Sequence, residues 1–264
     1  MYVSIQLSEG LGKQLFQIAA LLRLQKDRTI VLEYNKNTKS PIFQDQLYVL
    51  PDFDYRQISF TQFLYDTDAT DITTNIQQSN HHLMLKGTFQ TFQNITDDIR
   101  KKMIEIVYSN EDLMYEAYEK YNAIKRYFGE HTTDNDIICV HIKRNVTADK
   151  NTLYLDYYKK GLHMANKKYV VIFSDDIEWC KKNIAKNMYP YENIYFVNTM
   201  SSTEVEFILM SMFQHHIISN SAFSLWASYI SSYENRKQII IAPKDWYFEE
   251  TMETIYHSKI THII

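Results

Sequence analysis

Residues 137–176 read IICVHIKRNVTADKNTLYLDYYKKGLHMANKKYVVIFSDD. The apolar runs at 137–142 and 169–173 have the length of buried strands, and the pattern over 155–166 between them is helical. A strand, a helix of about 10–15 residues and a second strand predict a βαβ unit, which places both strands in a parallel sheet. The same alternation fills the rest of the second half. Its further strand-like runs are 194–197, 216–219 and 238–242, and its further helical patterns are 176–187, 203–215 and 222–232.

The first half shows a weaker form of the same pattern. A strand over 3–7 is expected to lead through a glycine turn into the helix-like QLFQIAALLRLQ, and residues 96–127 are mostly helical in pattern. Further strands are expected at 29–32 and 82–85, whereas residues 41–80 are expected to be irregular. The polar stretch 129–136 is the expected linker. We therefore predict an α/β protein of two lobes with mostly parallel sheets, with boundaries 1–130 and 131–264.

Composition excludes several classes of protein. The chain has 264 residues, of which 23% are charged, and a formal net charge of -4. This length can bury a sizeable core, and the charged fraction is ordinary for a globular protein rather than a disordered one. The slightly acidic balance argues against nucleic acid as a partner. Cys139 and Cys180 lie beside apolar runs and are expected to be reduced thiols in the core.

No targeting or membrane segment is expected. The opening MYVSIQLSEG lacks the basic region and the apolar stretch of a signal peptide. Apolar runs such as 137–142 are far shorter than the roughly 20 residues that a membrane span requires. We therefore expect a cytoplasmic protein without an integral membrane segment. Peripheral association with a membrane stays open, and the sequence indicates no oligomeric state.

Polar side chains gather where three of the expected strands end. They are His141, Lys143 and Arg144 after the first run, Ser174, Asp175 and Asp176 after the second, and Asn220 and Ser221 after 216–219. Ligands of open parallel sheets bind outside the carboxyl ends of the strands, where the strand order reverses. Three clusters at neighbouring strand ends would converge on one crevice, and this convergence is what predicts a site.

Each cluster also has a purely structural interpretation. His141 on a buried strand is, taken alone, more often a hydrogen-bonded core histidine than a ligand contact. Ser174 with its two aspartates fits an ordinary helix N-cap followed by acidic first-turn residues. The helix start after Ser221 offers free N–H groups that suit a phosphate, and Lys143 and Arg144 would add positive charge.

The glycine turn near the start of the chain is a weaker signal. Gly10 and Gly12 take up two of the five glycines of the chain in one strand–turn–helix segment, which is the arrangement of phosphate-cradling turns. The turn lacks the third glycine of a dinucleotide fingerprint and the ending of a P-loop. A ligand contact and tight packing are equally good interpretations of this turn.

Seven segments, in order along nearly the whole chain, resemble the motifs of the α-1,2-fucosyltransferases, which form glycosyltransferase family eleven. They are SEGLGKQLFQIAA at 8–20, LKGTFQ at 85–90, HIKR at 141–144, YY at 157–158, FSDDIEW at 173–179, LMSMFQHHIISNSAFSLW at 209–226 and IAPKDWY at 241–247. The family forms of the first and third segments are G-L-G-N-Q-L-F-Q-Y-A and H-x-R-R-G-D-Y. The joint occurrence of these segments is highly specific.

The resemblance implies a GT-B-like fold of two facing Rossmann-type lobes. It also implies an inverting transfer of L-fucose from a GDP-fucose donor to the 2-hydroxyl of a galactoside in a glycan acceptor, with no cofactor and no metal. The implied catalytic residues are Arg144, Lys143 and His141, of which His141 and Arg144 touch nucleotide and diphosphate. The implied donor contacts are Ser174, Asp175 and Asp176 at base and ribose, Asn220, Ser221, Phe223 and Ser224 at the diphosphate, and Gly10, Gly12 and Gln14 from the first lobe.

The departures from the family pattern keep alternatives open. Lys143 replaces the first arginine of H-x-R-R-G-D-Y, and the glycine and aspartate are absent. The catalytic base is not identified; Glu9 and Asp149 are the candidates. A transferase that uses another nucleotide sugar remains an alternative. So do a metal-dependent transferase that holds its ion on Asp175 and Asp176, and a catalytically inactive module that binds glycan or nucleotide.

Overall fold

The computed structural model describes residues 1–25, 28–32, 40–43, 62–65, 81–93, 95–144, 153–184, 193–198, 201–231, 237–244, 256–257 and 259–264. The chain divides into two compact units, Met1–Glu111 with Glu250–Tyr256, and Asp112–Glu249 with His257–Ile264. Each unit contains a parallel sheet with helices, as predicted for an α/β protein. No helix in the described ranges is both long enough and apolar enough to cross a membrane.

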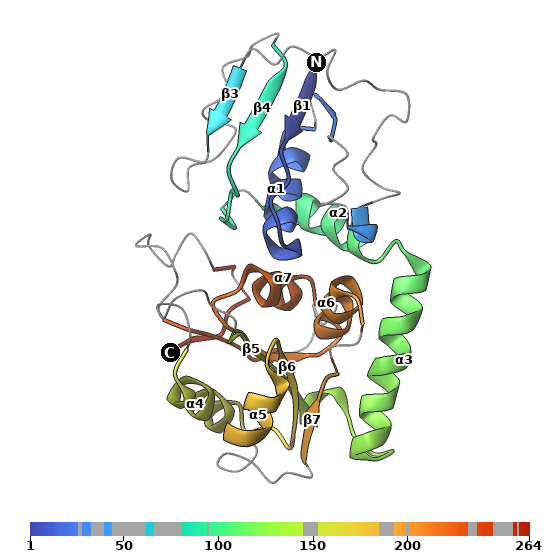
Figure 1. Ribbon diagram of the computed structural model, residues 1–264, viewed down its shortest axis with the longest axis vertical. Helices are drawn as coiled ribbons and strands as arrows, with labels where there is room; N and C mark the ends of the chain where they lie inside the picture. Colours follow the sequence, from blue (N-terminus) through green and yellow to red (C-terminus); the bar gives the residue numbers. More distant parts are fainter. Residues whose placement is uncertain are drawn as a thin grey trace. The chain divides into compact units, whose positions relative to one another are not determined.

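The first unit contains a four-stranded sheet in the order β2-β1-β4-β3, with every pair parallel (Figure 1). Its elements are β1 (Tyr2–Ile5), α1 (Leu11–Arg23), β2 (Thr29–Ile30), η1 (Pro41–Phe43), β3 (Gln62–Tyr65), β4 (Leu83–Lys86) and α2 (Asp97–Val107). The predicted strands at 3–7, 29–32 and 82–85 are confirmed within a few residues. The expectation that 41–80 is irregular misses β3, which pairs along its whole length with β4.

Buried carboxamides hold the turn before α1. Gln17 is fully buried, and the two N–H groups of its Nε2 are shared among three acceptors: the carbonyl of Gln6 at 3.1 Å, Ser8 Oγ at 3.1 Å and the carbonyl of Gly87 at 2.8 Å. Gln14 Nε2 donates to the carbonyl of Ser8 at 3.0 Å. An amide that satisfies several backbone carbonyls replaces the water these groups would lose on burial, so the turn is held in one conformation.

The second unit contains a six-stranded parallel sheet in the order β10-β9-β8-β5-β6-β7. Its strands are β5 (Ile137–Ile142), β6 (Tyr169–Ser174), β7 (Ile194–Phe196), β8 (His215–Ile217), β9 (Ile240–Ala242) and β10 (His262–Ile263). Its helices include α4 (Leu155–Ala165), α5 (Ile177–Asn183), α6 (Thr203–Ser211) and α7 (Ala222–Ile230). Every strand and helix predicted for 137–242 is present, and β10 was not predicted.

Helices cover both faces of this sheet, with α4 and α5 on one side and α6 and α7 on the other (Figure 1). Alternate residues of β5, beginning with Ile138, pack with Tyr158 and Leu162 of α4 and with Cys180 of α5 in one apolar cluster. Burial on both faces explains why these strands appear in the sequence as continuous apolar runs. Cys139 and Cys180 are buried free thiols, as predicted.

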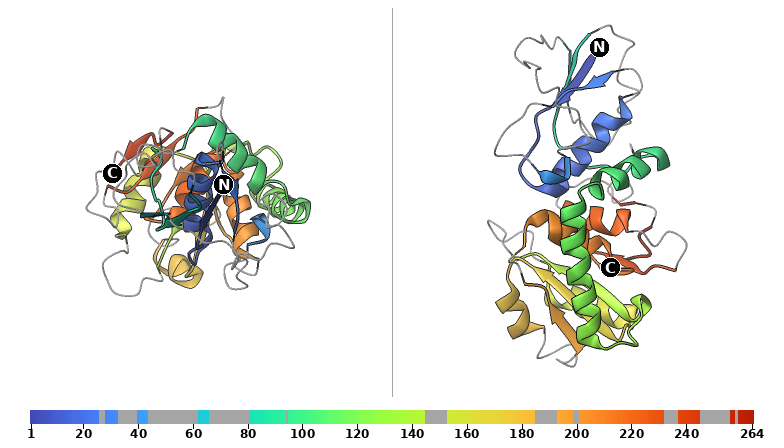
Figure 2. Two further views of the ribbon diagram at one scale, coloured as in Figure 1. Left: turned by 90° about the horizontal axis from the view of Figure 1, so that it is seen from above. Right: turned by 90° about the vertical axis from the view of Figure 1, so that its right-hand side faces the viewer.

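The long helix α3 (Glu111–Phe128) belongs to the second unit, so the chain divides at Glu111 rather than near residue 130. Tyr121 of α3 lies 5.3 Å from the Phe213 ring, and Phe128 stacks on Tyr169 at 4.5 Å. Figure 2 (right) shows α3 running alongside the strands of the second unit. Gly129 ends α3 with φ of 108°, donating to the carbonyls of the last turn, so the predicted linker begins as a helix stop.

Candidate active site

The strand order of the second unit reverses between β5 and β8. From β5 the chain adds β6 and then β7 on one side, and it returns to place β8, β9 and β10 on the other side. Because β5 pairs in parallel with both β6 and β8, the three polar clusters predicted from the sequence lie at one edge of the sheet. This reversal is the place where open parallel sheets bind ligands.

His141 joins the two sides of the reversal. Its Nδ1 lies 2.7 Å from Oγ of Ser219, which follows β8, and its ring lies 5.8 Å from the ring of Phe223 in α7. The pKa of His141 is lowered to about 4, chiefly by burial; Asp175 opposes this shift and Lys143 adds to it. The imidazole is therefore neutral at pH 7. Because its Nδ1 is engaged by Ser219, its Nε2 is the nitrogen left for a ligand.

Two cations, Lys143 and Arg144, follow β5 and have no acidic partner among the residues that the structure describes. The backbone N–H of Arg144 donates to Asp175 Oδ1 at 2.7 Å, and its guanidinium carbon lies 4.0 Å from the centroid of the Trp179 ring. Within the part of the chain that the structure describes, the Arg144 guanidinium and the Lys143 ammonium have no hydrogen-bond or ion-pair partner, and Nε of Arg144 is buried. A buried donor without an acceptor costs free energy, so this group is suited to receive an anionic ligand.

The cluster after β6 has the structural role that its spacing suggested, with one change. Asp176, not Ser174, is the N-cap of α5, and its Oδ1 accepts from the Trp179 N–H at 2.9 Å. Ser174 Oγ accepts from the Asp176 N–H at 3.0 Å. The cap lies at Asp176 because α5 starts at Ile177. Asp175 is exposed and links this strand end to that of β5 through Arg144.

The start of α7 differs from that of α5. Ser221 is its N-cap, and the side chain of Ser221 makes no capping hydrogen bond. The hydroxyl of Ser224 donates to the carbonyl of Ser221 at 3.3 Å, so this side chain does not cap either. Asn220 and Ser221 are buried at this strand end, while Phe223 is partly exposed. The first N–H groups of α7 therefore remain available to an anion.

The three residues predicted from the glycine turn lie in the first unit. Gly10 is the N-cap of α1 with φ of 88°, a conformation that glycine adopts without strain, and an added Cβ would meet no atom within 4 Å. Gly12 and Gln14 are buried in the first turns of α1. Gln14 has a visible packing role through Ser8. Of the two candidate bases, Glu9 is exposed beside this turn, and Asp149 lies outside the described residues.

The described residues contain no group of three histidine, cysteine, aspartate or glutamate side chains that could hold a metal ion. Asp175 and Asp176 each use an oxygen to accept a backbone N–H.

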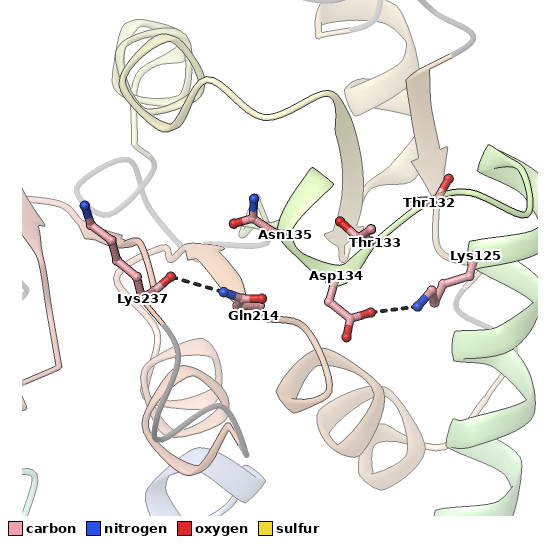
Figure 3. Close-up of a pocket in the computed structure, with 7 residues that line it drawn as sticks. All are labelled: Lys125, Thr132, Thr133, Asp134, Asn135, Gln214 and Lys237. Carbon is pink, nitrogen blue, oxygen red and sulfur yellow. Dashed lines mark hydrogen bonds and ion pairs between the residues drawn. The ribbon is translucent and has the colours of Figure 1, made fainter.

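A cavity of about 570 Å³ lies at the opposite edge of the same sheet (Figure 3). Its lining residues come from α3 and from the segments just before β5, β8 and β9, and they are Lys125, Thr132, Thr133, Asp134, Asn135, Gln214 and Lys237. Lys125 forms an ion pair with Asp134 at 2.8 Å. None of the residues predicted to bind the donor lines this cavity, because they follow the strands rather than precede them.

Sequence reasoning missed two residues at the predicted site. Ser219 forms a hydrogen bond with His141, and the ring of Trp179 packs against the guanidinium of Arg144. Both residues lie inside the motif segments quoted above. Their contacts could not be predicted, because they join residues 35 and 78 positions apart and a single sequence does not indicate such pairs. By contrast, the links from His141 to Phe223 and from Arg144 to Asp175 join residues that were predicted to converge.

A family model described as Glycosyl transferase family 11 matches residues 2–263 of the chain. The chain belongs to this family. The expected resemblance is thereby confirmed, and the protein is a glycosyltransferase.

This chain is similar to three relatives whose activities are named. It is 25% identical to the O-antigen biosynthesis glycosyltransferase WbnK of Escherichia coli over 91% of this chain and 93% of that protein. It is 33% identical to the alpha-1,2-colitosyltransferase of Escherichia coli, over 44% of this chain and 43% of that protein. It is 28% identical to the galactoside 2-alpha-L-fucosyltransferase SEC1 of Bos taurus, over 40% of this chain and 28% of that protein.

Solved structures support the fold. POFUT1 in complex with GDP matches 90% of this chain and 98% of that chain with a TM-score of 0.54 and 11% identity. A point mutant of Arabidopsis thaliana FUT1 in complex with GDP matches 90% of this chain and 70% of that chain, also with a TM-score of 0.54, at 10% identity. Family 11 membership and these matches identify the two α/β units as a GT-B-like fold, as predicted.

Proposed function

We propose that this family 11 glycosyltransferase moves L-fucose from GDP-fucose to the 2-hydroxyl of a galactoside in a glycan, with inversion at the transferred carbon. The observation that carries the proposal is the pair of cations, Lys143 and Arg144, at the reversal of strand order, neither of which has an acidic partner within the described ranges. A departing nucleoside diphosphate is the anion that such an enzyme must stabilise. The uncapped start of α7 supplies N–H donors for the same anion.

Each residue has a separate part in this mechanism. Arg144 offers a planar fork of donors to the phosphate oxygens, and Lys143 adds a second, more mobile charge. Burial lowers the pKa of His141 to about 4, which makes its neutral imidazole a weak base, and we assign it a hydrogen-bonding contact instead. The proton of the attacking hydroxyl must go to another group, for which Glu9 and Asp149 remain the candidates.

The choice of donor rests on the relatives. Both solved structures named above hold GDP, and the bovine relative is named for the transfer of L-fucose to a galactoside. One observation favours a second candidate: the 33% identical relative is named an alpha-1,2-colitosyltransferase. Transfer of colitose would use the same diphosphate contacts, and the two candidates differ only in the sugar.

A thermal-shift panel followed by a transfer assay tests the proposal. GDP present at 100 times its dissociation constant should stabilise the protein by about 2.7 kcal/mol relative to the ligand-free protein. UDP at the same concentration should stabilise it less. Purified protein should then consume GDP-fucose or GDP-colitose in the presence of a galactoside, and transfer should survive EDTA. A larger shift with UDP than with GDP would overturn the donor proposal. Loss of transfer on chelation, restored by Mn²⁺, would favour the metal-dependent alternative.

An assay with the donor sugar and no acceptor distinguishes an active transferase from an inactive binding module. An active transferase should slowly hydrolyse its donor sugar in the absence of acceptor, because water can replace the hydroxyl group. A module that only binds nucleotide would show the thermal shift without hydrolysis or transfer.

A further inference from the structure

The contact between Arg144 and Trp179 is close for its kind. The guanidinium carbon lies 4.0 Å from the centroid of the indole ring, compared with 4.8 Å for the ammonium of Lys168 over Tyr169. Tryptophan is the strongest aromatic partner for a cation, and a guanidinium can also stack flat on the ring. The ring therefore attracts Arg144 and restricts its orientation.

Trp179 is itself held at several points. Its backbone N–H donates to Asp176 Oδ1 at 2.9 Å, and its backbone carbonyl accepts from Asn183 Nδ2 at 2.8 Å. Its partly buried ring packs against the apolar cluster under β5 and β6. A side chain fixed at its backbone and along its ring forms a firm support for a neighbouring group.

Within the described ranges, the Trp179 ring is the contact that supports the Arg144 side chain. Its backbone N–H is fixed by Asp175 at 2.7 Å, but no described residue accepts a hydrogen bond from the guanidinium, and Nε is buried. A long arginine side chain without such a contact samples many rotamers. Its orientation thus depends on the ring, while its donors remain free for a ligand.

We infer that Trp179 is a positioning residue that holds the Arg144 guanidinium ready for the diphosphate of the donor. This inference rests on the proposed function, because it takes Arg144 as the diphosphate contact. Trp179 would act only through Arg144, whereas a ring that merely packs in the core would affect stability and binding regardless of the residue at 144.

A double-mutant cycle on the full chain tests this inference. The variants are Trp179→Leu, Trp179→Phe, Arg144→Ala and the two combinations with Arg144→Ala. Tyr127→Leu removes a half-exposed ring of α3 as a matched control. The dissociation constants of GDP and inorganic pyrophosphate are measured for each variant, with the melting temperature and, for the active proteins, kcat and KM for GDP-fucose.

Trp179→Leu should weaken binding of both probes about two- to thirtyfold, which is the range of a cation–π contact. Trp179→Phe should lose only about two- to threefold. In the Arg144→Ala background neither change should matter by more than about twofold. If Trp179→Leu does not melt cooperatively, Trp179→Phe gives the same comparison at smaller amplitude.

Two results would overturn the inference alone. One is an equal loss of binding from a Trp179 substitution with and without Arg144, and the other is binding by Trp179→Leu that matches the Tyr127→Leu control. A wild-type protein that binds neither GDP nor pyrophosphate would overturn the proposed function and the inference with it.

Discussion

Replacing Arg144 by alanine should affect turnover far more than folding. The side chain follows β5 at the strand reversal and has no acidic partner among the described residues. It therefore contributes little to the free energy of unfolding. Removing one preorganised donor to developing negative charge typically costs about 10²–10³ in rate, roughly 3–4 kcal/mol. The loss to stability should be the ring contact with Trp179, about 0.5–1 kcal/mol. In a protein of this size that is a melting shift of about 1–4 °C.

Steady-state transfer and melting temperature should be measured together on Arg144→Ala and its controls. Arg144→Lys should recover part of the rate, because an ammonium keeps the charge but not the fork, and Lys143→Arg should be tolerated. Lys168→Ala is the matched control, because Lys168 also lies over an aromatic ring but precedes β6 at the other edge of the sheet. If Arg144→Ala keeps the turnover of Lys168→Ala, this strand end is not the diphosphate site.

Three further outcomes are expected. Ser219→Ala removes the 2.7 Å hydrogen bond to His141 and should lower kcat/KM roughly two- to tenfold. Ser228→Ala is the control, because Ser228 is a buried serine bonded to His257, and it should leave kcat/KM unchanged. Equal values of kcat/KM for the two variants would contradict the role of Ser219. Urea unfolding between pH 7 and 4 should show stability falling, because burial lowers the pKa values of His141, His215 and His216 from 6.5 to about 4, so the unfolded chain binds more protons. The slope from three groups is at most roughly 4 kcal/mol per pH unit, and His216→Gln should reduce it by about a third; an unchanged slope would be inconsistent with this origin. Gly10→Ala should cost roughly 1–3 kcal/mol through its φ of 88° alone, since no atom crowds the new Cβ, and an unaltered melting temperature would refute that strain.

The sheet of the second unit was predictable because its strands are buried on both faces. β5 was predicted to the residue, since five of its six residues are apolar and buried, as expected for an inner strand of a βαβ unit. The convergence at the site followed from the same topology, because parallel strands end at one edge. The proximity of His141, Arg144 and Asp175 was therefore predictable from the sequence.

The elements that escaped prediction depend on tertiary pairing. β3 carries the exposed rings of Phe63 and Tyr65, and both residues of β10 are exposed, so neither strand shows a buried apolar run. Strand formation in such segments is decided by the neighbouring strand rather than by intrinsic preference. The ring of Trp179 under Arg144 is a contact of the same kind, because it arises only once β5 and β6 lie side by side.

The position of α3 matters for anyone who wishes to study the second unit by itself. The buried stripe of this helix consists of Ala117, Tyr121, Ile124 and Phe128. A fragment cut at residue 131 would leave their partners Phe213 and Tyr169 facing water, together with the lost bond between Tyr121 and Asp134. Exposed aromatic surface of this kind promotes aggregation. A dissection that begins at Glu111 keeps the helix with the sheet it stabilises.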